Sequence, residues 1–517
     1  MQRILGVVAL SLACACAQAP EPQAAAAQTP ELWQGVFDLG TMHGGLELRL
    51  DQQNVSAPLM LRTSPRGRLE TTTSKDAAVT AQQIKFTADV EGVSYRFTGS
   101  RQHSGWTGTM SPDGQGAAGT WRVSRTDLAP SPQPLDILPT PTGEFPVGRT
   151  AFHWVDDKRP ELETKDPADK RNLLVYLFYP ATKPPSAEPA PYIPDGELMR
   201  SVWKDDLTNK LLQLKTHTFA EAPLSKTRKT FPVLVFAPGG GQKALSYTAL
   251  LEDLASRGFV IAAIEFPHNA QAMQWPDGTM LTRVAQVDQG WEVAATREEH
   301  ARIYVRQVEH WARDLSFVLD QLTMLNSNEP RFAGRLDLAR VGAIGHSKGG
   351  MAAGMVRLID SRFRGGMNID GSDLGNGLRT LADNKAGKQP FLWLEKQFKW
   401  PTPEEFTKAG ITEAEFTAVT ADGDRLLASV SGGASHVEIA QPGLNHLDFG
   451  DYAFWTTAND PAARAAKLRT LRIVSGYTVS FFDGALNANW RNYRQLAQDK
   501  TTLPEVSVQH LGAAWGR

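Results

Sequence analysis

Cysteine is nearly absent from the sequence, and its scarcity excludes several kinds of chemistry. The chain of 517 residues contains 2 cysteines, Cys14 and Cys16, and both lie close to its start. The rest of the chain therefore has no disulfide, no thiol nucleophile and no cysteine-ligated metal site. A long basic run is also absent, and 54 basic residues nearly balance 56 acidic ones, so nucleic acid is not an expected partner.

The first residues have the pattern of an export signal. A basic start is followed by the apolar run 4–13, which is too short to span a bilayer, and then by small residues. We expect residues 1–27 to be a signal peptide and tether, and the mature protein to be periplasmic or secreted. The stretch 11–14 resembles an imperfect bacterial lipobox, so the alternative is a lipoprotein anchored through Cys14 or Cys16, in peripheral contact with a membrane.

A chain of this length is expected to form two domains. Residues 30–125 contain short alternating runs of apolar and polar residues separated by turn formers, which predicts a small antiparallel all-β domain. Residues 126–141 are rich in proline and predict a stiff linker. Residues 142–517 alternate apolar strands with helices, which is typical of an α/β domain with a mostly parallel sheet and helices on both faces.

Aromatic residues in the first domain have two interpretations. Trp33, Trp106 and Trp121 are expected to fill the core of the β-domain, because aromatic side chains in small β-domains are usually buried. The alternative is that the domain binds lipid, glycan or substrate.

The second domain contains a series of buried strands and two notable helical regions. The expected strands are 231–236, 259–265, 341–344, 365–369, 391–394 and, as the last core strand, 436–439. A long helical region is expected over 291–325 and a closing helix over 462–486. Helix-like segments between 401 and 428 are a candidate lid.

The stretch 341–350, VGAIGHSKGG, organises this domain. An apolar run ends on Gly345-His346-Ser347-Lys348-Gly349, and small residues follow it, as in a nucleophile elbow. In such an elbow the serine lies on a strained turn between strand and helix, which makes Ser347 the candidate nucleophile. Because a bare G-x-S-x-G occurs by chance, the assignment depends on partners that follow in the order acid and histidine.

A serine hydroxyl needs a base and a group that orients that base. His446 follows the last expected core strand in a short polar loop, where this fold class presents its base, whereas His346 is expected to point away across the turn. Asp370 and Glu395 end successive strands, and the residues themselves leave both open as the acid.

The tetrahedral intermediate of acyl transfer needs backbone N–H donors. One donor is expected from Lys348, directly after the nucleophile, and the other from the glycines 239–241. No G-K-[ST] follows these glycines, so they do not form a phosphate-binding P-loop.

Several stretches between 141 and 486 together form a more specific signature than the elbow alone. They are 141–143, 147–150, 177–181, 191–195, FPVLVFAPGGG at 231–241, 257–265, VGAIGHSKGG and the closing FFD at 481–483. They resemble the secreted platelet-activating-factor acetylhydrolases and their bacterial relatives, which have the α/β-hydrolase fold. The chain departs from that family at 237–241, where Ser-His-Gly-Leu-Gly is usual.

The resemblance implies roles for individual residues. In that family the acid follows the strand after the elbow, which implies Asp370 rather than Glu395. It likewise implies His446 as the base, and Gly240 and Lys348 as the oxyanion donors. At Lys348 the family more often has phenylalanine or leucine.

We therefore predict an exported serine hydrolase that cleaves carboxylic esters, with short-acyl lipid or phospholipid esters as the favoured substrates. The chemistry requires no metal and no organic cofactor. Two alternatives are a serine peptidase or acyltransferase with the same triad, and a catalytically inactive envelope binding protein.

Overall fold

The structure is a computed structural model that describes residues between 31 and 511. The signal and tether at 1–27 and both cysteines lie outside the described residues, as does most of the linker at 126–141. Inside these limits, the residues not described are 39–42, 51–59, 64–69, 91–92, 103–104, 113–118, 127–137, 165, 184–187, 195–213, 271, 276–279, 283–296, 372–388, 398–401, 410–411, 415–416, 418–432 and 458–459.

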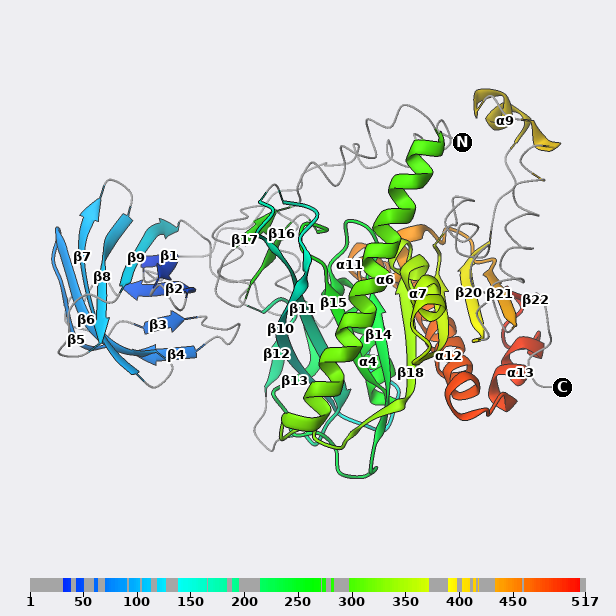
Figure 1. Ribbon diagram of the computed structural model, residues 1–517, viewed down its shortest axis with the longest axis horizontal. Coiled ribbons are helices and arrows are strands. Elements are labelled where there is room, and N and C mark those ends of the chain that lie inside the picture. Colours follow the sequence, from blue (N-terminus) through cyan, green and yellow to red (C-terminus); the bar gives the residue numbers. More distant parts are fainter. Residues whose placement is uncertain are drawn as a thin grey trace.

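The N-terminal part forms a nine-stranded antiparallel sheet in the order β4-β3-β2-β1-β9-β8-β7-β6-β5 (Figure 1). As expected, its core contains Trp33, Trp106 and Trp121, each no more than 2% exposed. The guanidinium of Arg101 lies over the rings of Trp33 and Trp106, at 5.4 and 5.3 Å from their centroids. The strands are β1 (Glu31–Asp38), β2 (His43–Leu50), β3 (Met60–Thr63), β4 (Glu70–Thr73), β5 (Lys75–Val79), β6 (Gln83–Val90), β7 (Val93–Gln102), β8 (Gly105–Pro112) and β9 (Gly119–Thr126).

The second part is built on an eleven-stranded mixed sheet in the order β12-β13-β10-β11-β15-β14-β18-β19-β20-β21-β22. The six strands from β15 to β21 are parallel to one another, as the apolar runs of the sequence predicted, and the strands that flank this group, β11 and β22, pair with it antiparallel. The strands are β10 (Val147–Pro160), β11 (Lys170–Pro180), β12 (Pro189–Pro191), β13 (Lys215–Ala220), β14 (Phe231–Ala237), β15 (Val260–Glu265), β18 (Leu336–His346), β19 (Phe363–Ile369), β20 (Phe391–Lys396), β21 (Ala434–Ile439) and β22 (Val506–Leu511).

Helices cover both faces of this sheet (Figure 1). Successive residues of β14 point to opposite faces: Val235 belongs to the same hydrophobic cluster as Leu315 of α6, and Leu234 belongs to the cluster that contains Phe482 of α12. The remaining elements are η3 (Ala244–Tyr247), α4 (Thr248–Ser256), β16 (Ala272–Gln274), β17 (Met280–Thr282), α6 (Arg297–Asn328), α7 (Lys348–Ile359), α9 (Pro403–Ala409), η4 (His446–Phe449), α11 (Tyr452–Thr456), α12 (Pro461–Asn487) and α13 (Arg491–Gln498).

A buried ion-pair network joins the β10–β11 hairpin to α6. Arg171, on β11, is 1% exposed, and its guanidinium lies 2.7 Å from Asp314 on α6 and 2.9 Å from Glu161 in the hairpin connection. Burial alone would raise the pKa of Asp314, but the positive charge of Arg171 outweighs it and the pKa is lowered. The network holds the end of this long hairpin against α6.

Two expectations about the second domain need correction or restriction. The strand at 436–439 is not the last of the sheet, because β22 pairs antiparallel with β21, with Val437 opposite Val508. The segment VSVQHL that forms β22 alternates apolar and polar residues, so it lacks the continuous apolar run of a central strand. Within the candidate lid at 401–428, α9 is described and most other residues are not. No helix in the described part of the chain is both long and apolar enough to cross a membrane.

Candidate active site

Ser347 lies on a sharp turn between β18 and α7. Its φ is 53° and its ψ is −123°, a combination that costs a non-glycine residue on the order of 1–3 kcal/mol. Its backbone N–H donates to the carbonyl of Ile369 (2.8 Å), which fixes the turn against β19. The serine hydroxyl makes no capping hydrogen bond to α7. This is the elbow geometry that the sequence predicted.

Glycines around the serine are required by close backbone approach. A Cβ on Gly345 would lie 2.3 Å from the backbone of Gly349, and a Cβ on Gly349 would lie 2.2 Å from the carbonyl oxygen of Ala237. Distances this short exclude any side chain without a shift of the backbone. The elbow, its helix and the end of β14 are therefore packed backbone against backbone.

His446 and Asp370 are hydrogen-bonded to one another. Nδ1 of His446 lies 2.6 Å from Oδ2 of Asp370, whose side chain is 3% exposed, whereas that of His446 is 39% exposed. The other carboxylate oxygen of Asp370 accepts the backbone N–H of Lys396 (3.0 Å). Because a carboxylate only accepts, Nδ1 of a neutral His446 carries the proton and Nε2 carries the lone pair.

Glu395, the other candidate acid, is engaged elsewhere. Its Oε1 lies 2.8 Å from Nε2 of His436, on the neighbouring strand β21, and its Oε2 accepts from the indole of Trp393 (3.2 Å). The structure thus brings Asp370, and not Glu395, to His446.

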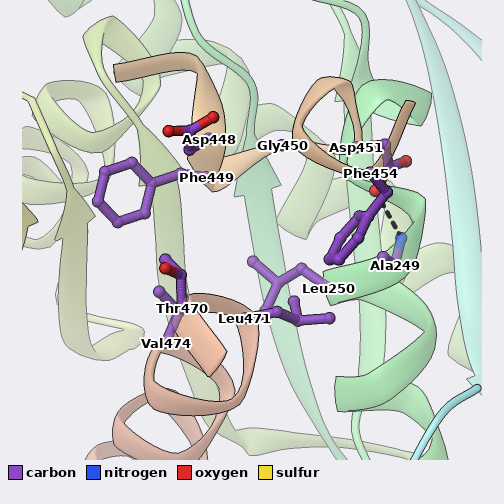
Figure 2. A pocket seen from close by; sticks show the side chains of 10 residues that line it. All are labelled: Ala249, Leu250, Asp448, Phe449, Gly450, Asp451, Phe454, Thr470, Leu471 and Val474. Atoms are coloured by element: carbon purple, nitrogen blue, oxygen red, sulfur yellow. Dashed lines mark hydrogen bonds between the residues drawn. The ribbon is translucent and has the colours of Figure 1, made fainter. Parts of the chain in front are cut away.

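The loop that carries His446 is held by two buried carboxylates. Asp448 accepts the backbone N–H of Asn445 (2.7 Å) and pairs with Lys467 of α12. Asp451 accepts the N–H of Thr248 (2.7 Å), at the start of α4. Burial raises the pKa of Asp451 to about 7. Figure 2 shows both carboxylates lining a pocket between this loop, α4 and α12.

The glycine loop after β14 has its backbone groups held by specific partners. The N–H of Gly239 donates to the hydroxyl of Tyr247 (3.2 Å), and the N–H of Gly241 donates to Oδ1 of Asn269 (3.0 Å). The N–H of Gln242 turns back to the carbonyl of Gly239 (3.1 Å). Between them, the N–H of Gly240 donates to no residue in the described part of the chain.

The glycine loop lies directly against the elbow. A Cβ on Gly239 would lie 3.4 Å from Cβ of Ser347, and one on Gly240 would lie 3.8 Å from Cε of Lys348. The ammonium of Lys348 lies 4.0 Å from the centroid of the Trp311 ring. The side chain of Lys348 therefore runs beside the glycine loop towards α6.

The sequence suggested that His346 points away from the site, but its ring contacts both Tyr247 and the backbone of His446. Its Nδ1 lies 2.7 Å from the hydroxyl of Tyr247, and its Nε2 lies 3.0 Å from the backbone carbonyl of His446. Its ring centroid is 4.4 Å from that of His446. Burial, and then the neighbouring His446, lower the pKa of His346 well below its usual value, so this ring is neutral.

Two groups of described residues have the composition and spacing to hold a metal ion. One consists of His346, Asp370 and His446; Nδ1 of His446 is already hydrogen-bonded to Asp370, and Nε2 of His346 to the backbone carbonyl of His446. The other consists of Glu395, His436 and Glu438, with ligand atoms within 4.8 Å of one another. In this second group the imidazole and one carboxylate already form the 2.8 Å pair.

Sequence reasoning missed the contacts of Tyr247 and Asp451. Tyr247 lies 99 positions before His346, whereas Asp451 lies in the same loop as His446, and no local motif marks either residue. The alternation of apolar and polar residues does not indicate them either, because Tyr247 ends the short helix η3, Asp451 is the N-cap of α11, and both are buried.

Comparisons with known proteins agree with the resemblance noted in the sequence. Residues 133–456 match the family model for platelet-activating factor acetylhydrolase, isoform II. A probable 1-alkyl-2-acetylglycerophosphocholine esterase from Arthroderma benhamiae is 24% identical over 276 residues, covering 50% of this chain and 64% of that protein. A platelet-activating factor acetylhydrolase from Cavia porcellus is 27% identical over 223 residues, covering 39% and 50%. The chain thus matches about half to two thirds of the length of these curated relatives.

A solved structure extends the likeness to the architecture. A ferulic acid esterase from Streptomyces cinnamoneus is 26% identical and has a TM-score of 0.53, covering 72% of this chain and 98% of that chain. The α/β architecture with a mixed sheet is therefore shared with an esterase. Because the family model matches well over half of the sequence, the chain belongs to the platelet-activating factor acetylhydrolase, isoform II family.

Proposed function

We propose that this protein is a carboxylic ester hydrolase with the α/β-hydrolase fold, in which Ser347, His446 and Asp370 form the catalytic triad. The observation that carries the proposal is the 2.6 Å contact between the buried Asp370 and His446, at the same edge of the sheet as the strained Ser347. Family membership and the likeness to two kinds of esterase support the reaction class.

In the proposed reaction, Oγ of Ser347 attacks the carbonyl carbon of the ester while its proton passes to Nε2 of His446. The bond to the alcohol oxygen then breaks, and that oxygen takes the proton from His446, leaving an acyl-serine. Water then gives a proton to His446 and attacks the acyl carbon. The bond between that carbon and Oγ of Ser347 breaks, and His446 returns the proton to Oγ, which releases the acid and the free serine. Asp370 holds the imidazole in the required tautomer throughout.

We assign the oxyanion donors to the backbone N–H groups of Gly240 and Lys348. The amides of Gly239 and Gly241 already have acceptors, which favours Gly240 within that loop. Lys348 directly follows the proposed nucleophile and is the first residue of α7, where the helix dipole favours negative charge.

The substrate class follows from the relatives. Short-acyl lipid or phospholipid esters are the first candidates, because one curated relative is a platelet-activating factor acetylhydrolase and another is a probable 1-alkyl-2-acetylglycerophosphocholine esterase. Hydroxycinnamate esters are the second, because the structurally similar protein is a ferulic acid esterase. Export through residues 1–27 stays a prediction, which N-terminal sequencing of the protein from fractionated cells would test.

The decisive experiment combines active-site labelling with a substrate panel. A fluorophosphonate probe should modify the wild-type protein on Ser347, as located by mass spectrometry. The panel comprises acetyl and longer-chain phospholipids, methyl ferulate, a peptide and an acyl acceptor. Ser347→Ala and His446→Ala should each remove nearly all ester hydrolysis in folded protein. Activity within about tenfold of wild type in either variant would contradict the triad.

A further inference from the structure

A chain of three hydrogen bonds connects the glycine loop to the catalytic base, and its direction can be worked out from the donors and acceptors. The backbone carbonyl of His446 can only accept a hydrogen bond, so Nε2 of His346 must be protonated and must donate to it. A neutral imidazole has one N–H, so Nδ1 of His346 is an acceptor. The hydroxyl of Tyr247 therefore donates to Nδ1, and its oxygen accepts the N–H of Gly239.

The two ends of this chain belong to different parts of the proposed machinery. Gly239 precedes Gly240, the proposed oxyanion donor, and the other end is the backbone of the base itself. The loops that it joins come from β14 and from the segment after β21, which are separated in the sheet by β18, β19 and β20. Tyr247 is 2% exposed and His346 is 1% exposed, so water does not compete for these bonds.

We propose that Tyr247 and His346 are positioning residues that hold the oxyanion loop and the base His446 in register with one another. The inference deepens the proposed function and rests on it. Neither side chain is placed in contact with substrate. They act because a donor for the oxyanion is effective only at the position where the negative charge develops, and that position is defined relative to the attacking serine and its base.

A purely structural role is the competing explanation, because both rings also pack. The Tyr247 ring lies 5.0 Å from that of Phe236, and the His346 ring lies 5.9 Å from that of Phe449. Tyr247→Phe keeps this packing and removes only the hydroxyl. It leaves the N–H of Gly239 and Nδ1 of His346 without their shared partner, while the bond from Nε2 of His346 to the His446 carbonyl remains.

The test compares Tyr247→Phe with a matched control, Tyr477→Phe. Tyr477 is equally buried, at 1% exposure, and its hydroxyl donates to the carbonyl of Leu496 (3.2 Å) between α12 and α13, outside the proposed machinery. Rates are normalised to active sites titrated with a fluorophosphonate. Tyr247→Phe should lower kcat by about 10- to 100-fold with KM nearly unchanged, whereas Tyr477→Phe should leave kcat unchanged.

Two further measurements separate positioning from loss of structure. A trifluoromethyl ketone, which forms a tetrahedral adduct with the serine, should bind Tyr247→Phe more weakly by the same factor as kcat falls. His346→Gln retains an N–H for the His446 carbonyl, so it should lose less kcat than His346→Leu. If Tyr247→Phe fails to fold, the test is the difference in kcat between His346→Gln and His346→Leu, each normalised to the active sites that the fluorophosphonate titrates.

The outcomes are distinguishable from failure of the proposed function. Wild-type kcat in Tyr247→Phe, alongside an inactive Ser347→Ala, would overturn the positioning role alone. A rise in KM without loss of kcat, or equal losses in the tyrosine variant and its control, would overturn it as well. Full activity of Ser347→Ala would instead remove the triad on which the inference rests.

Discussion

Replacing Asp370 by asparagine tests which carboxylate serves the base. Asparagine has nearly the shape of aspartate, and its oxygen can still accept the N–H of Lys396, as Oδ1 of Asp370 does at 3.0 Å. Its amide NH₂ then faces Nδ1 of His446 at the 2.6 Å contact. A donor at that position requires Nδ1 to be the acceptor, which moves the proton of His446 to Nε2. The nitrogen that must receive the serine proton is then already protonated.

The loss of the correct tautomer and of the buried negative charge determines how far kcat should fall. In a serine hydrolase triad the acid-to-amide change lowers kcat on the order of 10⁴-fold, equivalent to about 5 kcal/mol in activation free energy. Glu395→Gln is the matched control, because Glu395 ends the adjacent strand and also pairs with a histidine, His436. That pair is about one-fifth exposed on each side, so its loss costs at most about 1 kcal/mol of stability and should not change kcat.

The assay is hydrolysis of a chromogenic acetyl ester at pH 7–8 (about the pH at which a histidine base is neutral), with kcat normalised to titrated sites. Thermal unfolding of both variants checks that each is folded. Asp370→Asn retaining more than about one tenth of wild-type kcat would refute the assignment of the acid. So would a loss in Glu395→Gln comparable to that in Asp370→Asn.

Three further predictions concern stability and can be measured by denaturant or thermal unfolding. Gly349→Ala should destabilise the fold by several kcal/mol, because its Cβ would lie 2.2 Å from the carbonyl oxygen of Ala237. Gly476→Ala, within α12, should instead stabilise it by about 0.5–1 kcal/mol, because its Cβ would lie 3.9 Å from Cδ1 of Leu496. Burial raises the pKa of Glu265 to about 7 from 4.5, so this residue makes the protein lose about 3 kcal/mol of stability as pH rises between those values. Glu265→Gln should remove that loss, and an unchanged pH dependence would contradict the assignment. Arg171→Met should cost about 3–5 kcal/mol, because the buried Asp314 and Glu161 lose the cation that they share, although Asp314 keeps its contact with Arg159 (2.7 Å). Adding Asp314→Leu should recover part of that cost.

Much of the site could be predicted because the residues that form the turn at Ser347 are adjacent in the sequence. An apolar strand, a serine and small residues describe one turn, and the backbone contacts of Gly345 and Gly349 show why those glycines occur there. The choice between Asp370 and Glu395 could not be made from the residues alone. Strand β20 is apolar on both faces, with Leu392 and Leu394 on one side and Phe391 and Trp393 on the other. Because both faces of the strand are apolar, the residues alone do not indicate whether Glu395 or Asp370 faces His446.

Features that depend on distant parts of the chain were not predictable in the same way. The edge strand β22 follows β21 after more than sixty residues that include α12, and its alternating pattern also fits an exposed segment. The ion pair between Arg171 and Asp314 joins residues 143 positions apart. The hydrogen bond between Tyr247 and His346 spans 99 positions. The spacing of apolar residues along the sequence does not predict such contacts, because each contact depends on how the helices and strands pack together.

The same contacts explain why buried polar groups accumulate near the proposed site. A serine, a base and an oxyanion donor that come from three strand ends cannot be held in register by apolar packing alone, since apolar contacts are not directional. Directional bonds from Tyr247, His346 and Asp451 fix the loops, but each polar group must be removed from water to do so. Burial raises the pKa of Asp451, and that of Glu265 at the end of β15, to about 7, because removal from water disfavours the charged form. Stability is thus given up around the site so that the separate loops keep one arrangement.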